Sequence, residues 1–331
     1  YNTVVGDEAG TAITTGDFNT VLGYAALDAA VLVNNNIAVG SASLSTNVHS
    51  SKNVAVGSNS LETHNLGSAG DGYNTAVGYN SGIAVTTGKF NNLFGALAGD
   101  ALTTGDSNTA IGYVSLSSDT KGERAVAVGE GALFTQNFTS ETNNYNTAVG
   151  YNAGYGVTTG TQNTLIGGLA GDALEDADAN VAIGYQALTT DTLGSRSVAV
   201  GFSALRFQAN TSAVETHNVA VGHAAGEAVT TGFQNTLIGG LAGDAITTAG
   251  ENAAFGYNAL VADTKGSHSV AVGPYALQTQ NFTSATDSFN TAVGYNAGGA
   301  VTTGTNNTLI GGLAGDAITT ASNSTAVGSY S

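Results

Sequence analysis

The stretch 145–154 reads YNTAVGYNAG, and nearly the same ten residues recur along the chain. YNTAVGYNSG occupies 73–82, HNVAVGHAAG 217–226 and FNTAVGYNAG 289–298, so the starts lie 72 residues apart. A fixed internal period is typical of repeat architectures, in which each unit stacks on its neighbours. The sequence therefore predicts a repetitive fold rather than a chain built around one active site.

A shorter repeat lies within the 72-residue cycle. When the Asn of NTAVG is position one, successive units are 17, 17, 17 and 21 residues long, and the cycle restarts at 2, 74, 146, 218 and 290. Nineteen starts fit, and no stretch is left over. We therefore expect one repetitive domain over residues 1–331.

Three positions of the unit are nearly constant. Position five is Gly in all nineteen units, as in Gly78, Gly95 and Gly112, which indicates a turn with positive φ or a close backbone contact. Position four is always apolar, as in Val77, Phe94 and Ile111. Position one is Asn in fifteen units, including Asn74, Asn91 and Asn108. We expect a short strand that ends at the glycine.

Units of this length are too short for a helical hairpin, and glycine at this spacing would break helices. Each unit is therefore expected to form one coil of an all-β fold, a parallel β-solenoid or β-roll of about 19 coils. Parallel strands stack about 4.8 Å apart, so identical positions should form ladders. The Asn column is then expected to be a ladder of stacked amides.

The strand pattern also predicts self-association. Positions two and four share one face, and position three points the other way. Position three is nevertheless always Ala, Val or Leu, so both faces are expected to be buried. We expect the position-three column to pack against other copies in a homo-oligomer, most simply a homotrimer. The alternative is that this column lines the lumen and the opposite face is apolar and exposed.

Composition narrows the possible partners. The formal charge is −17, from 24 acidic and 7 basic residues, which disfavours nucleic acid and anionic lipid. There is no cysteine, so disulfides and thiolate metal sites are excluded. No run of 18 apolar residues is present, and we expect no membrane insertion within this segment.

The candidate catalytic and metal-binding residues are not expected to meet at one site. The five histidines occupy no common column, and we expect no catalytic residue, cofactor or metal, and no enzyme activity. One Asp column recurs at position ten of the second coil in each cycle. Its members are Asp28, Asp100, Asp172, Asp244 and Asp316. The favoured interpretation is a turn Asp bonded to its own backbone, and ion binding stays open.

The extra residues of the 21-residue coils form polar loops within 62–73, 134–145, 206–217 and 277–289. Loops on a rigid scaffold commonly carry binding residues. Their aromatic rings could stack on sugars, with weak contacts multiplied over several loops. These candidates are Phe138, Tyr145, Phe207, Phe282 and Phe289. The alternative is that the rings fold back and fasten each loop to its coil.

Several segments resemble a known family. SVAVG at 197–201 and 269–273, NVAVGS at 53–58 and NVAIG at 180–184 resemble the YadA-like head repeats of trimeric autotransporter adhesins, and similar repeats occur in bacteriophage tail fibres. The resemblance implies a trimer of interlocked β-rolls that displays an adhesive surface.

We therefore expect a non-enzymatic, extracellular structural and adhesive fibre at a cell or virion surface. Its expected partners are further copies of the chain and a surface glycan or protein receptor. The alternative function is a bacteriophage tail fibre or virion appendage that recognises a host glycan.

Overall fold

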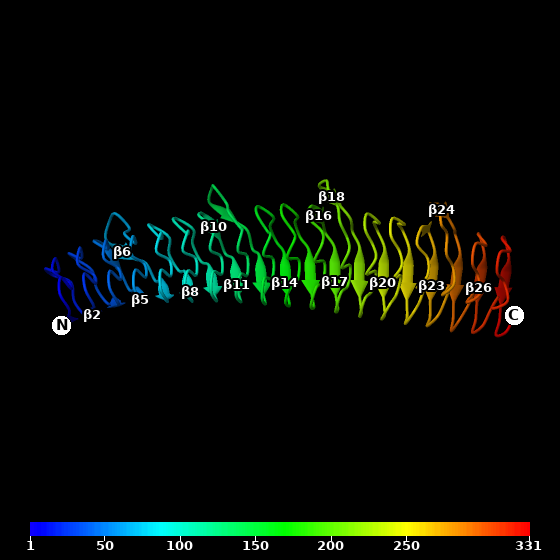
Figure 1. Cartoon of the computed structure of the whole chain (residues 1–331), viewed down its shortest axis with the longest axis horizontal. Helices are drawn as coiled ribbons and strands as arrows, with labels where there is room; N and C mark the ends of the chain where they lie inside the picture. Colours follow the sequence, from blue (N-terminus) through cyan, green and yellow to red (C-terminus); the bar gives the residue numbers. More distant parts are fainter. The chain divides into compact units, whose positions relative to one another are not determined.

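The computed structural model describes residues 1–331, which form strands and turns without any helix. The chain divides into two compact units, Tyr1–Asn163 and Thr164–Ser331. Each unit is a parallel β-solenoid, and the units together hold about 19 coils, as the repeat predicts (Figure 1). With no helix present, there is none that could cross a membrane.

The first unit contains one three-residue strand in each coil and two pairs of shorter strands. The three-residue strands are β1 (Thr3–Val5), β2 (Thr20–Leu22), β3 (Ile37–Val39), β5 (Val54–Val56), β7 (Thr75–Val77), β8 (Asn92–Phe94), β9 (Thr109–Ile111), β11 (Val126–Val128) and β13 (Thr147–Val149). The short strands are β4 (Ser50–Ser51), β6 (Gly70–Asp71), β10 (Gly122–Glu123) and β12 (Thr142–Asn143).

The second unit follows the same plan. Its three-residue strands are β14 (Thr164–Ile166), β15 (Val181–Ile183), β17 (Val198–Val200), β19 (Val219–Val221), β20 (Thr236–Ile238), β21 (Ala253–Phe255), β23 (Val270–Val272), β25 (Thr291–Val293), β26 (Thr308–Ile310) and β27 (Thr325–Val327). Its short strands are β16 (Gly194–Ser195), β18 (Val214–Glu215), β22 (Gly266–Ser267) and β24 (Thr286–Asp287).

Within each unit, every strand pairs in parallel with the strand of the next coil, position for position. Asn92 of β8, for example, pairs with Thr109 of β9, and Phe94 pairs with Ile111. The strand ends before the glycine of position five, whose φ is +139° at Gly95. A Cβ on Gly95 would also clash with the carbonyl oxygen of Gly112. Both reasons for the invariant glycine are therefore confirmed.

The position-three column lines the lumen of each unit. Ala76, Leu93 and Ala110 are fully buried, whereas Phe94 and Ile111 at position four are 39% and 41% exposed on the outer face. The expectation that position three packs against another copy is therefore wrong, and the alternative is confirmed. The turns of each coil close over the face that carries position three. Its mostly small side chains fit the narrow space between strand and turns.

The sizes of the side chains that fill this lumen repeat every four coils. Leu93 fills the space above two glycines at position nine, because a Cβ on Gly82 or Gly99 would lie 2.7 or 2.8 Å from a methyl carbon of Leu93. In the third and fourth coils the sizes are exchanged, and Leu116 and Leu133 at position nine are fully buried. Large and small residues thus alternate between strand and turn, as dense packing requires.

The Asn column is buried, and most of its bonds run between side chain and main chain. The main-chain N–H of Asn91 donates to Oδ1 of Asn74 at 2.9 Å, and the N–H of Asn108 donates to Oδ1 of Asn91 at 2.9 Å. Nδ2 of Asn91 donates to the carbonyl of Gly105 at 2.9 Å. Each amide therefore joins neighbouring strands and closes its own coil. Amide-to-amide bonds of the expected kind also occur in several coils, as from Nδ2 of Asn252 to Oδ1 of Asn235 at 3.2 Å.

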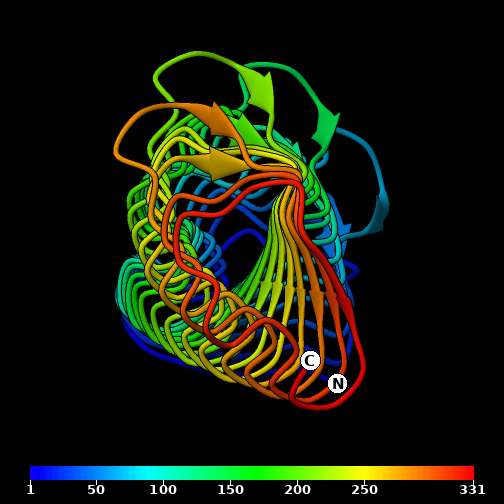
Figure 2. The same ribbon diagram turned by 90° about the vertical axis from the view of Figure 1, so that its right-hand side faces the viewer.

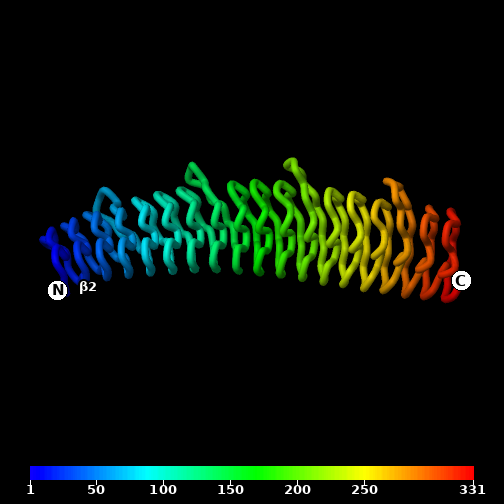
Figure 3. Tube along the Cα trace, viewed as in Figure 1, coloured from blue at the N-terminus to red at the C-terminus, as the bar shows by residue number.

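The 21-residue coils carry loops that project from the side of the solenoid next to the strand ladder. Each described unit has two such projections, which are visible along its trace (Figure 3). In the second unit the loops of β18 and β24 project beyond the coils, while the three-residue strands lie along another side (Figure 2). The loops thus stay clear of the outer face of the strands.

Candidate functional site

The loops are held by a buried polar cluster that repeats once per cycle. Asp119 at position twelve of a third coil is fully buried. It accepts hydrogen bonds from the N–H groups of Gly122 at 2.9 Å and Phe138 at 3.1 Å, and from Nε2 of Gln136 at 2.6 Å. Burial raises the pKa of Asp119, and these hydrogen bonds oppose that shift. The root of the loop is thereby fixed in place.

The same cluster reaches the Asn column. Oε1 of Gln136 accepts from Nδ2 of Asn146 at 2.8 Å, and Oε1 of Gln280 accepts from Nδ2 of Asn290 at 2.8 Å. Asp, Gln and Asn come from three successive coils, so the loop is joined to the interior of the solenoid. We regard the root as a rigid base for the exposed part of each loop.

The first cycle builds this base from different residues. His64 takes the place of the Gln, Asn47 that of the Asp, and Ser50 that of the Gly. Oγ of Ser50 lies 2.8 Å from Nε2 of His64, and Nδ2 of Asn53 donates to Oγ of Ser50 at 2.9 Å. Burial lowers the pKa of His64 to about 4, so this ring is neutral at pH 7.

The five predicted contact aromatics divide into two groups. Phe138 and Phe282 are only 6% and 5% exposed, because they fold back under their loops. The expectation that these two rings contact a ligand is therefore wrong, and the fastening alternative describes them. Tyr145, Phe207 and Phe289 are 53%, 43% and 52% exposed and stay candidates.

Exposed charges and rings meet at the corner between loop and strand ladder. A basic residue ends each third coil, and a ring ends each fourth coil. The basic residues are Lys52, Arg124, Arg196 and His268, and the rings are Tyr73, Tyr145, His217 and Phe289. Nζ of Lys52 lies 5.0 Å from the ring centre of Tyr73, and the Arg124 guanidinium lies 5.8 Å from that of Tyr145. Contacts of this length are cation–π interactions.

Acidic residues of the short loop strands complete three of these corners. Nζ of Lys52 lies 2.8 Å from Asp71, and Arg196 lies 3.0 Å from Glu215. A ring nitrogen of His268 lies 3.1 Å from Asp287. The Lys52 ammonium lowers the pKa of Asp71. Sequence reasoning missed these corners because their members lie 19 to 21 residues apart, and only the 72-residue period could have aligned them.

The Asp column at position ten is hydrogen-bonded within the solenoid where its contacts are described. Asp100 accepts from the Ser117 hydroxyl at 2.5 Å, and Asp172 accepts from the Thr189 hydroxyl, both one coil further on. Burial raises the pKa values of Asp172 and Asp244. No group of three or more His, Asp or Glu residues is placed to hold a metal ion. The structure does not bring these five residues together.

Comparisons with protein-family models, with curated proteins and with solved structures give no match for this chain. The fold creates two candidate surfaces for contact with other molecules, the outer face of the strand ladder and the loop corners.

Proposed function

We propose that this chain is a non-enzymatic structural and adhesive fibre, formed by three copies that pack through the outer face of the strand ladder and display their loops. The observation that carries the proposal is the unbroken apolar column at position four on a face without charge. No charged residue stands at position two or four in any coil, although the chain carries 24 acidic residues. Contiguous exposed apolar surface of this kind marks interaction sites.

Aromatic residues extend this face beyond the strand ends. Tyr79 follows β7 and Tyr151 follows β13, and each is 56% exposed. In the second unit, Phe202 stacks on Tyr185 at 5.7 Å and on His223 at 5.4 Å between ring centres. Aromatic surface is enriched at protein interfaces, because large rings bury much area at little entropic cost.

A second copy of the same chain is the occupant we favour. Identical positions form in-register ladders within each unit, so a like ladder offers a partner of matched spacing. Closed symmetry with a small number of copies is the usual outcome of such self-complementary packing. The loops lie on another side of the coil and stay free for multivalent contacts with a surface glycan or protein receptor.

The proposed setting is extracellular, at a cell surface or on a virion. The sequence resemblance to the heads of trimeric autotransporter adhesins and to bacteriophage tail fibres motivates both settings. A multivalent fibre works in the same way in each, since weak contacts repeated along a rigid scaffold add up to strong attachment.

The test is the mass of the particle in solution, measured by light scattering after size exclusion. We expect a mass three times that of the 32.7 kDa chain. Ile111→Glu places a charge on the apolar face and should release single chains. Thr87→Glu, which changes an exposed residue away from the strands, should leave the trimer intact. A wild-type monomer, or an Ile111→Glu variant that keeps the wild-type mass, would refute the proposal.

A further inference from the structure

The loop of the third cycle differs from the others at its root. Asn210 stands where Phe138 and Phe282 stand in the second and fourth cycles. Those two phenyl rings are buried beneath their loops, whereas the shorter Asn210 side chain donates to the carboxylate of Asp191 at 3.3 Å. The third loop therefore lacks the aromatic group that fills the space beneath the other two.

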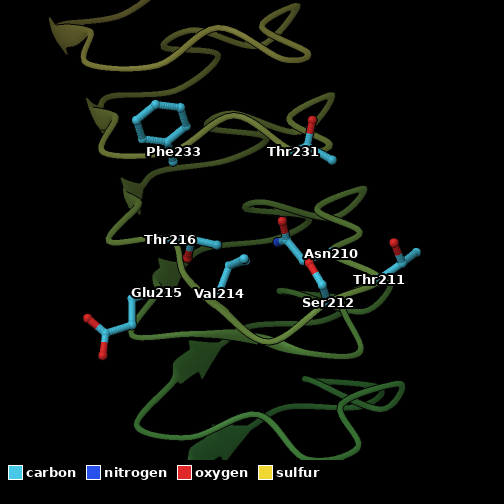
Figure 4. Close-up of a pocket in the computed structure, with 8 residues that line it drawn as sticks. All are labelled: Asn210, Thr211, Ser212, Val214, Glu215, Thr216, Thr231 and Phe233. Carbon is cyan, nitrogen blue, oxygen red and sulfur yellow. The ribbon is translucent and has the colours of Figure 1, made fainter.

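A hollow of about 390 Å³ lies beside this third loop. Its lining includes Asn210, Thr211, Ser212 and Val214 from the loop, and Thr231 and Phe233 from the next coil. Figure 4 shows the side chains of Phe233, Asn210 and Val214 around one space, while the carboxylate of Glu215 points away from it. A volume of this size falls in the range of about 300–1,000 Å³ that is typical of small-molecule sites.

Two apolar side chains of this hollow are found only at the third loop. Phe233, in the coil after that loop, stands where the coils after the other loops have Lys89, Thr161 and Thr305, and Val214 stands where the other loops have Gly70, Thr142 and Thr286. Phe233 is 47% exposed and Val214 is 40% exposed. The third loop thus lacks the buried ring of the other loops, and an exposed ring lies instead in the wall of the hollow, where a ligand can reach it.

The polar groups around these side chains suit a neutral ligand. Thr211, Ser212 and Thr231 supply hydroxyl groups, which both donate and accept hydrogen bonds. The charged residue of the lining, Glu215, is paired with Arg196 at 3.0 Å and with His217 at 3.3 Å. No Lys or Arg lines this hollow, so a phosphate or sulfate would find no counter-charge in its wall.

We propose that this hollow binds one neutral sugar residue, with an apolar C–H face of the pyranose against Phe233 and Val214 and its hydroxyls bonded to the Thr and Ser side chains. The ring quadrupole of Phe attracts the partly positive C–H edges of such a ligand. The site rests on the proposed adhesive function and names its ligand class. The third loop then carries a sugar site that the other loops do not share.

The test is saturation-transfer NMR on the intact chain with the methyl glycosides of glucose, galactose, mannose and N-acetylglucosamine as probes. We expect transfer to the ring C–H protons of at least one of them. Phe233→Thr introduces the residue that follows the second and fourth loops at this position and should weaken binding about tenfold. Asn210→Phe replaces a lining residue by the bulky ring of the second and fourth loops and should also weaken binding.

Thr305→Phe is the matched control, because it adds a ring at the same position of the coil after the fourth loop, where the phenyl of Phe282 is present. It should leave the affinity unchanged. The inference is overturned when no probe receives saturation from the wild-type chain, or when Phe233→Thr and Asn210→Phe both bind as tightly as wild type. Particle mass, measured on the same samples, separates this result from the proposed fibre, since a trimer without sugar binding refutes the site alone.

Discussion

Residues Asn91–Gly95 show two faces of one strand with opposite requirements. Asn91 and Leu93 point into the lumen and are fully buried, whereas Asn92 and Phe94 point outward, and Phe94 is 39% exposed. Both faces carry an Asn and a large apolar residue, so composition does not distinguish them. The inward pair is constrained by hydrogen bonds and by the size of the lumen, whereas the exposed outward pair is under neither constraint within a single chain.

The glycine that follows this strand should give the largest effect. Gly95→Ala places a Cβ at a φ of +139° and against the carbonyl of Gly112, so both strain and overlap must be relieved. We expect a loss of more than about 4 kcal/mol in the free energy of unfolding, measured with urea. Gly312→Ala is the control, because a Cβ there meets no atom within 4 Å. Equal stability of the two variants would contradict the role assigned to position five.

The second-largest effect is expected from the buried leucine of this strand, and its exposed neighbour phenylalanine serves as the comparison. Leu93→Ala empties the space above Gly82 and Gly99 and should cost about 3 kcal/mol of unfolding free energy. Phe94→Ala should cost less than about 1 kcal/mol in the single chain, because its ring is already partly in water. Its effect should instead be seen as a smaller particle mass. A Phe94→Ala variant that is destabilised as much as Leu93→Ala would break the comparison.

A buried and an exposed histidine should differ in their effect on how stability depends on pH. The pKa of His64 is about 4 in the folded chain and about 6.5 when unfolded, so the unfolded chain takes up the proton first. Stability is therefore lost as the pH falls from about 6.5 to 4, by at most about 3 kcal/mol. His64→Gln, which copies the other cycles, should remove this loss in urea titrations. His217→Gln, at a side chain that is 45% exposed, should leave it in place.

The smallest expected difference in stability is between two adjacent asparagines, one buried and one exposed. Asn91→Ala leaves the buried N–H of Asn108 and the carbonyl of Gly105 without their partners, and should cost about 2 kcal/mol. Asn92→Ala changes an exposed residue and should stay within about 0.5 kcal/mol of wild type. Urea unfolding of both variants measures the difference, and equal losses would remove the ladder as a stabilising element.

The candidate site was only partly open to sequence reasoning. The 17-17-17-21 spacing located the loops, and three of the five aromatic candidates are exposed. Phe138 and Phe282 were misjudged because aromatic rings serve equally well as buried plugs and as contact surfaces. Phe233 was not singled out, since it lies outside the 21-residue coils. Comparison of the four cycles at equal positions is the signal that would have found it.

The sequence by itself determined the repeat, the coil boundaries, the strand ends and the parallel solenoid, because glycine, asparagine and apolar residues recur at fixed positions. It did not determine which side of the strand faces inward, since positions two to four are mostly small or apolar and alternation defines two faces without orienting them. Only the tertiary structure decided this, through the path by which the turns of each coil close over position three. It also decided which charges and rings meet at the loop corners, because these residues come from different coils and become neighbours only when the coils stack.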